Sequence, residues 1–155
     1  MEPGLEPGHY AVTDPAKRSM LLTALYMAQE QYGYLSPEAM ERVARRLSMS
    51  PREVYNTATF YSMFRTEPVG RHVIQVCEGL SCHLAGGAED LFDFLMERLG
   101  IGAGQTTGDG RFTLQMVQCL AACGSSPAMR INDTLYTNLT LGQVDTILQE
   151  LEERP

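Results

Sequence analysis

The sequence predicts an α+β fold in which a helical module precedes a domain of mixed strands and helices. Two observations carry this prediction. In the first part of the chain, apolar residues recur at helical spacing behind three cap-then-proline starts. After residue 68, short β-branched runs are followed by helical patterns. We assign residues 1–13 to a flexible tail, 14–67 to a three-helix module and 68–155 to the second domain.

Each predicted helix of the module begins with a capping residue followed by proline, which suits the first helical position. Asp14-Pro15 opens the first helix, which we expect to end at Gly33. Ser36-Pro37 opens the second. Ser50-Pro51 opens the third, where Glu53 adds a capping box. The sequence therefore predicts three helices with short connections.

The second domain has the predicted order strand, helix, strand, strand, strand, helix. An Asn132-Asp133 turn joins the last two strands, and Thr140 with Gln143 forms a capping box at the start of the last helix. The predicted elements are strand 72–76, helix 84–99, strand 111–118, strands 128–131 and 135–137, and a final helix from 140 to about 153.

Charge and composition exclude several classes of partner. The net charge is −7 at pH 7 and no run of Lys or Arg is present, so we expect no binding to nucleic acid or to anionic membranes. No apolar stretch reaches the roughly 18–20 residues that span a bilayer. The first seven residues lack the basic and apolar regions of a secretory signal. We therefore expect a cytoplasmic protein without direct membrane insertion.

The four cysteines carry the chemistry. Cys77 and Cys82 are separated by four residues, and Cys119 and Cys123 by three. Each pair follows a predicted strand, so both pairs meet at one edge if the two strands are neighbours in a sheet. Cytosolic thiols are kept reduced, which favours a metal site over disulfides. Four thiolates in two pairs suit a [2Fe–2S] cluster, with one pair on each iron.

The spacing alone also fits a tetrahedral zinc site of four cysteines. The small residues inside the two pairs favour a cluster only slightly, because they leave room around inorganic sulfide. A thioredoxin-like dithiol is disfavoured, since four residues separate Cys77 from Cys82 where that motif has two. His83 follows a ligand, but a Rieske centre needs two histidines and the four cysteines suffice. We find no set of residues spaced for acid–base or nucleophilic catalysis.

Several segments together form a specific pattern that covers about residues 18–150. They are residues 31–35, 59–64, 68–71, 76–77, 82–84, Gly86, 107–114, 118–124 and Pro127. This pattern resembles the thioredoxin-like [2Fe–2S] subunit of respiratory complex I, with the four cysteines in register. The chain departs from the resemblance at two positions. The family usually has Gly where Ala121 stands and Ala where Ser126 stands.

The resemblance implies a thioredoxin-like [2Fe–2S] domain with a mixed four-stranded sheet, and Pro127 in the place of thioredoxin's cis-proline. It implies one cluster on Cys77, Cys82, Cys119 and Cys123, which exchanges one electron with the FMN of an adjacent NADH-oxidising subunit. FMN and NADH are expected only on that partner, and no catalytic residue is expected on this chain.

The implied host is NADH:quinone oxidoreductase, where other peripheral-arm subunits are further partners. Its peripheral arm lies on the cytoplasmic side of the inner membrane. The same type of subunit occurs in NAD-linked formate dehydrogenases and hydrogenases, so these hosts stay open. A structural zinc module is the alternative outside electron transfer.

Overall fold

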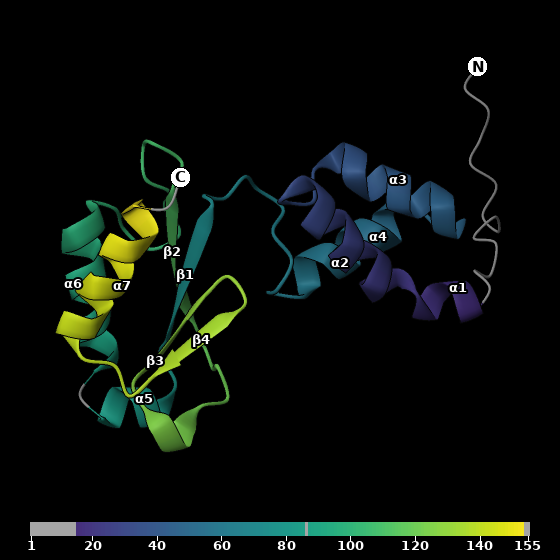
Figure 1. The fold of residues 1–155 in the computed structure, drawn as a ribbon. Coiled ribbons are helices and arrows are strands. Elements are labelled where there is room, and N and C mark those ends of the chain that lie inside the picture. The colour runs from purple at the N-terminus through teal and green to yellow at the C-terminus, as the bar shows by residue number, and fades with distance from the viewer. Residues whose placement is uncertain (1–14, 86, 154–155) are drawn as a thin grey trace. The chain divides into compact units, whose positions relative to one another are not determined.

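The computed structural model of the protein describes residues 15–85 and 87–153 (Figure 1). The chain divides into two compact units, and the boundary in the sequence falls between Pro68 and Val69. We call them the helical unit and the sheet unit. The tail predicted for residues 1–13 and the cap predicted at Asp14 lie outside the described residues. No helix within the described ranges is long and apolar enough to cross a membrane.

The helical unit has its own apolar core, to which Leu25, Leu35 and Val54 contribute fully buried side chains. Phe64 is buried in the same core, and its ring meets that of Tyr26 edge to face. The helices are α1 Pro15–Ser19, α2 Leu21–Tyr32, α3 Pro37–Leu47 and α4 Pro51–Phe60.

The first predicted helix is divided in the structure, because the chain turns at Met20. The Met20 N–H donates to the Lys17 carbonyl, three residues back, at 3.2 Å. The Ser19 hydroxyl donates to the Ala16 carbonyl at 2.8 Å. Such a local side-chain bond competes with helical hydrogen bonding. One predicted helix is therefore two, α1 and α2.

The predicted caps of the next two helices have different outcomes. At α3 the cap is confirmed, since Ser36 Oγ accepts a hydrogen bond from the Ala39 N–H at 3.2 Å. At α4 the predicted capping box is wrong. Ser50 makes no side-chain cap, and the Glu53 carboxylate instead accepts a hydrogen bond from Arg18 at 3.1 Å. The ion pair with α1 has replaced the local bond.

The sheet unit contains a four-stranded mixed sheet, which confirms the predicted fold class. Its strand order is β2-β1-β3-β4. The first two strands are parallel, whereas β3 is antiparallel to both of its neighbours. The strands are β1 His72–Cys77, β2 Phe112–Val117, β3 Ala128–Ile131 and β4 Thr134–Thr137.

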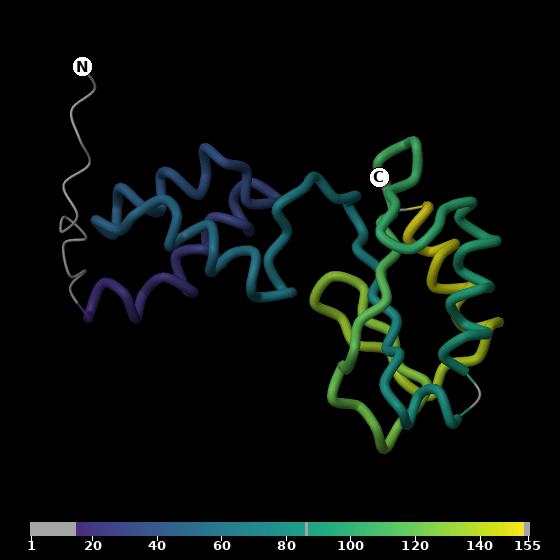
Figure 2. Tube along the Cα trace, turned by 180° about the vertical axis from the view of Figure 1, so that it is seen from behind, coloured from purple at the N-terminus to yellow at the C-terminus, as the bar shows by residue number. Residues whose placement is uncertain are grey.

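Helices α6 (Ala88–Leu99) and α7 (Leu141–Glu153) lie on one face of this sheet (Figures 1 and 2). Between the layers, Leu95, Leu114 and Leu148 are fully buried. The capping box predicted before α7 is confirmed: Gln143 Oε1 accepts from the Thr140 N–H at 2.9 Å, and the Gln143 N–H donates to Thr140 Oγ1 at 3.4 Å.

The helix predicted from residue 84 begins later, because the segment before it forms a separate short helix. Helix α5 spans Leu80–Leu84, and α6 starts at Ala88. Between them, Gly87 lies against the ring of Pro127. A Cβ atom on Gly87 would come within 2.3 Å of Pro127 Cγ. This close approach requires glycine and fixes where the two helices separate.

Candidate metal centre

The first cysteine pair is buried at the end of β1. Cys77 is the last residue of β1, and Cys82 lies within α5. Their exposed fractions are 3% and 2%. The two thiols are close enough to share a hydrogen bond. The structure therefore brings Cys77 and Cys82 together.

The second pair follows β2, the parallel neighbour of β1. Cys77 lies opposite Val117 in the ladder, so Cys119 comes two residues beyond that register position. Cys123 begins the short 3₁₀ helix η1 (Cys123–Ser125). Both Cys119 and Cys123 are exposed. The prediction that both cysteine loops emerge at one edge of the sheet is confirmed.

Contacts between the two loops join them into one site. Cys77, Cys82, Ala88 and Ala128 form a small buried cluster against which Leu120 packs. The Leu120 N–H donates to the Cys77 sulfur. Within the described residues, no three His, Cys, Asp or Glu side chains converge closely enough to hold a metal ion. The assignment of all four cysteines as ligands therefore stays a prediction.

The polar environment of the buried thiols differs between the two residues. Burial is the largest single influence on each thiol, and by itself it would raise the pKa of both Cys77 and Cys82. For Cys77 it outweighs the N–H groups of Gly79 and Leu120, so the pKa of this thiol lies above its ordinary value. For Cys82, hydrogen bonds with Ser126, Cys77 and the Ala128 N–H outweigh burial, so its pKa is lowered.

The backbone of the second loop aims polar groups at sulfur. Ala121 adopts a φ of 58°, and its N–H donates to Cys119 Sγ at 3.2 Å. The Ser126–Pro127 peptide bond is cis, which agrees with the place of thioredoxin's cis-proline that the resemblance gives to Pro127. Ser126 Oγ lies 3.5 Å from Cys82 Sγ. The two departures from the family pattern, Ala121 and Ser126, thus both contact cysteine sulfur.

Sequence reasoning identified the four cysteines but not these contacts. The family's usual Gly at position 121 was a signal for a positive φ, whereas nothing in the spacing pointed to the contact of Ser126 with Cys82. His83 has a half-exposed side chain 3.5 Å from the carboxylate of Glu89. His83 therefore lies at the surface beside a carboxylate.

The surroundings of Cys77 and Cys82 suit thiolate ligands. Two buried thiols receive backbone N–H groups, which stabilise negative charge on sulfur. In addition, the lack of a side chain at Gly79 allows a close approach between the two loops: a Cβ there would lie 3.0 Å from the Gln118 carbonyl oxygen and 3.4 Å from Cys77 Sγ. Sulfur donors suit both iron–sulfur clusters and zinc, so the donor set alone leaves both open.

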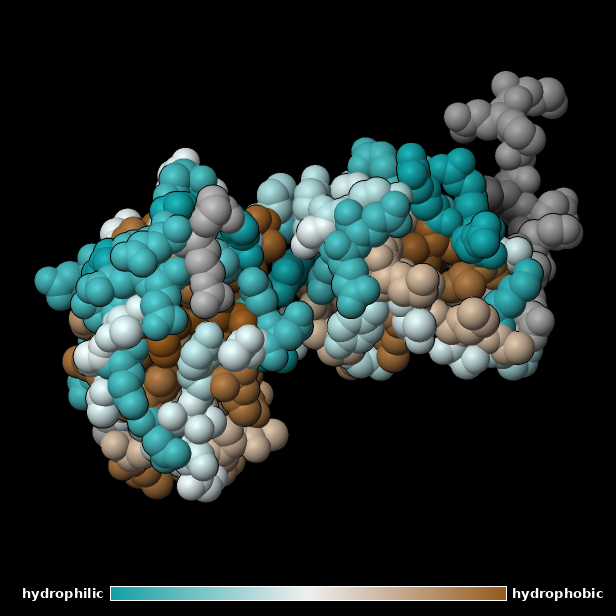
Figure 3. All heavy atoms as spheres, in the orientation of Figure 1, coloured by the Kyte–Doolittle hydropathy of each residue, from teal (hydrophilic) through white to brown (hydrophobic). Residues whose placement is uncertain are grey.

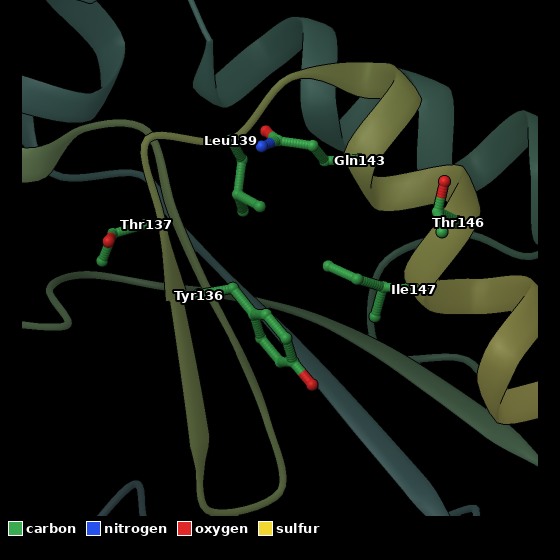
Figure 4. A pocket seen from close by; sticks show the side chains of 6 residues that line it. All are labelled: Tyr136, Thr137, Leu139, Gln143, Thr146 and Ile147. Atoms are coloured by element: carbon green, nitrogen blue, oxygen red, sulfur yellow. The ribbon is translucent and has the colours of Figure 1, made fainter.

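A surface groove lies between β4 and α7 (Figure 4). Apolar and neutral polar side chains line it. They come from Tyr136, Thr137, Leu139, Gln143, Thr146 and Ile147. None of the four cysteines predicted as ligands lines this groove.

Comparisons with known proteins agree with this site. Residues 9–152 match the model of a family described as thioredoxin-like [2Fe–2S] ferredoxin. The chain is 42% identical to one of the NADH-quinone oxidoreductase subunits of Rhizobium meliloti over 135 residues, 87% of this chain and 80% of that protein. It is 40% identical to NADH-quinone oxidoreductase subunit 2 of Thermus thermophilus over 136 residues, 87% of this chain and 75% of that protein.

A solved structure has the same fold. The crystal structure of an air-oxidised NAD⁺-reducing [NiFe]-hydrogenase matches with a TM-score of 0.77 and 28% sequence identity. The match covers 88% of this chain but only 23% of the hydrogenase chain. The similarity thus spans both units of this protein and about a quarter of that longer polypeptide.

Proposed function

Because the chain belongs to the thioredoxin-like [2Fe–2S] ferredoxin family, we propose that it is an electron-transfer subunit that carries one [2Fe–2S] cluster. Cys77 and Cys82 would hold one iron, and Cys119 and Cys123 the other. When bound, the cluster would accept and release one electron at a time. The chain itself would supply the four thiolates, directs backbone N–H groups at the sulfurs of Cys77, Cys82 and Cys119, and shields the Cys77–Cys82 side from water.

One observation carries the proposal: the two cysteine loops leave neighbouring parallel strands at the same edge. Cys77 ends β1, and Cys119 follows β2 two residues beyond the paired Val117. The exposure of Cys119 and Cys123 supports electron exchange with a partner at this edge, since electrons pass between centres only over short distances. The buried pair would anchor the site, and the exposed pair would face the partner.

We place the chain in NADH:quinone oxidoreductase, next to the subunit that binds FMN and oxidises NADH. The relatives named NADH-quinone oxidoreductase subunits support this host. The [NiFe]-hydrogenase match keeps an NAD-linked hydrogenase open as the host, and a formate dehydrogenase remains a further alternative. In the complex I host, the chain would lie on the cytoplasmic side of the inner membrane with other peripheral-arm subunits.

The helical unit offers a surface for the flavin-binding partner. It exposes large apolar and aromatic side chains, of which Phe60 is 80% exposed and Met27 64% exposed. Figure 3 shows hydrophilic side chains gathered over α3, with paler and brown side chains beside them on the same unit. Exposed apolar surface of this kind is typical of an interaction site. We therefore propose that this unit docks on the flavin-binding subunit.

Spectroscopy of the anaerobically purified chain tests the cluster. We expect broad visible bands that bleach with dithionite, and a low-temperature EPR signal with an average g value below that of the free electron. Cys77→Ser and Cys119→Ser should each lose or alter these signals, whereas Ser81→Ala, next to Cys82, should keep them. A colourless chain with about one bound zinc would refute electron transfer and favour the structural zinc module.

Co-purification tests the partner. The tagged chain should retain the FMN- and NADH-binding subunit, and Phe60→Ala with Met27→Ala should weaken that binding. Substitution of Thr146, in the groove of the sheet unit, serves as the control. A chain that recovers hydrogenase or formate dehydrogenase subunits instead would assign the host differently, while the cluster proposal would stand.

A further inference from the structure

Ser126 connects the two cysteine loops through a single hydroxyl group. Its Oγ lies 3.5 Å from Cys82 Sγ and donates to the Cys123 carbonyl oxygen at 3.2 Å. Cys82 is only 2% exposed, whereas Ser126 is half-buried at the rim of the site. One side chain from the second loop therefore contacts a predicted ligand of the first loop.

Which of the two groups donates the hydrogen bond depends on whether Cys82 is a neutral thiol or a thiolate. A neutral thiol has a proton and donates it to Ser126 Oγ, which leaves the hydroxyl proton for the Cys123 carbonyl. A metal-bound cysteine is a thiolate and has no proton to donate. The Cys82 sulfur then accepts hydrogen bonds only, and rotation about the Ser126 Cβ–Oγ bond is sufficient to turn the hydroxyl proton toward it.

We propose that Ser126 is a positioning residue that raises the reduction potential of the cluster by donating an O–H hydrogen bond to the Cys82 sulfur. The inference rests on the proposed function, because it needs a cluster bound through Cys82. Reduction adds one electron and increases the negative charge on the ligand sulfurs. A donor at sulfur stabilises this reduced state more than the oxidised state. No proton is transferred, since the hydroxyl proton stays on Ser126.

Because Cys82 is buried, the hydrogen bond from Ser126 to its sulfur should be strong. Hydrogen bonds strengthen where water is excluded, and a charged acceptor strengthens them further. The backbone N–H of Ala128 also donates to the Cys82 sulfur, and substitution at position 126 leaves this donor in place. Removal of the Ser126 hydroxyl therefore removes one hydrogen-bond donor to the Cys82 sulfur and leaves Cys82 itself unchanged.

An EPR-monitored potentiometric titration of the full chain tests the proposal. In Ser126→Ala, we expect the ratio of reduced to oxidised cluster at a fixed potential to fall about tenfold, which equals a shift of about 59 mV to more negative potential for one electron. Ser125→Ala is the matched control, because this neighbouring serine ends the 3₁₀ helix η1 and, among the described residues, its hydroxyl makes no hydrogen bond to a cysteine sulfur. It should keep the wild-type potential.

A pair of isosteric variants separates the hydroxyl from the size of the side chain. Threonine keeps the O–H group, and valine has nearly the same shape without it. Ser126→Thr should therefore titrate close to wild type and Ser126→Val close to Ser126→Ala. This comparison stays decisive if the alanine variant loses its cluster, because Thr and Val disturb the packing equally.

Resonance Raman spectra in H₂O and D₂O give a readout other than potential. The iron–cysteine stretching bands of wild type and Ser126→Thr should shift more in D₂O than those of Ser126→Val. Equal potentials and equal isotope shifts for the Thr and Val variants would overturn the role of Ser126. A wild-type chain that holds zinc and has no visible bands would instead overturn the proposed function, and the two failures are thus distinguishable.

Discussion

Ala121 has a strained backbone conformation at its contact with a cysteine sulfur. Its φ of 58° lies in the left-handed region, which glycine adopts freely and a residue with a Cβ adopts at a cost of roughly 1–2 kcal/mol. The conformation directs the Ala121 N–H to Cys119 Sγ, 3.2 Å away. Backbone strain is therefore located at the contact with a predicted ligand.

Ala121→Gly should relieve this strain. Glycine gains from the positive φ and loses through the greater entropy of the unfolded chain, so we expect a net stabilisation of about 0.5 kcal/mol. Urea unfolding followed by circular dichroism under anaerobic conditions measures it. Ala122→Gly is the matched control: residue 122 has a φ of −114°, so there glycine should destabilise. Equal effects at the two positions would argue against strain at Ala121.

At the scale of elements, α7 begins with a complete capping box. Thr140 and Gln143 bond each other's backbone N–H groups at 3.4 and 2.9 Å. Thr140→Ala removes the side-chain acceptor and should cost about 1 kcal/mol of unfolding free energy. Thr140→Ser keeps the acceptor and should cost less than half of that. The prediction fails if thermal unfolding gives both variants the same loss.

His72 lies at the edge of the sheet where β1 and β2 begin, and its titration should make the free energy of unfolding depend on pH. Burial, followed by the charges of Arg71 and Arg111, lowers the pKa of His72 from its ordinary value of 6.5. A histidine with a lower pKa in the folded state binds fewer protons when folded. The free energy of unfolding therefore decreases as the pH falls through 6.5 toward the folded-state pKa, and is unaffected by this group at higher pH.

His72→Gln should flatten this dependence between pH 7 and the lower pKa of the folded state. Arg71→Gln removes one of the two cations and should flatten it less. Urea midpoints measured across this pH range, each variant against wild type, give the comparison. An unchanged pH profile in His72→Gln would show that His72 does not carry the effect.

The sequence predicted these elements well where a periodic pattern and a local cap agree. Ser36 and Thr140 cap their helices as expected. The predictions from the sequence were wrong where contacts between residues far apart in the sequence determine the local structure. Ser50 leaves its cap unused because Glu53 pairs with Arg18, and α6 starts late because Gly87 lies against Pro127. The contact of Ser126 with Cys82 belongs to the same class, since 44 residues separate the two.

At the scale of the whole molecule, each unit has a core of its own. Leu25 belongs to the core of the helical unit and Leu148 to that of the sheet unit, and both side chains have an exposed fraction of 0%. The cysteine loops continue from strands of the second core. The physical stability of the site therefore depends first on the sheet unit, while the helical unit supplies the exposed apolar surface proposed for the partner.

Leu25→Ala and Leu148→Ala form a matched pair that tests this division in the full chain. Each removes the same buried atoms, and truncation of a core leucine to alanine costs about 2–5 kcal/mol. Hydrogen exchange read by mass spectrometry should show loss of protection in α2–α4 for Leu25→Ala and in β1, β2 and α7 for Leu148→Ala. Visible bands of the proposed cluster should weaken only in the second variant. Loss of protection in both units from either substitution would mean that the two cores unfold as one cooperative structure.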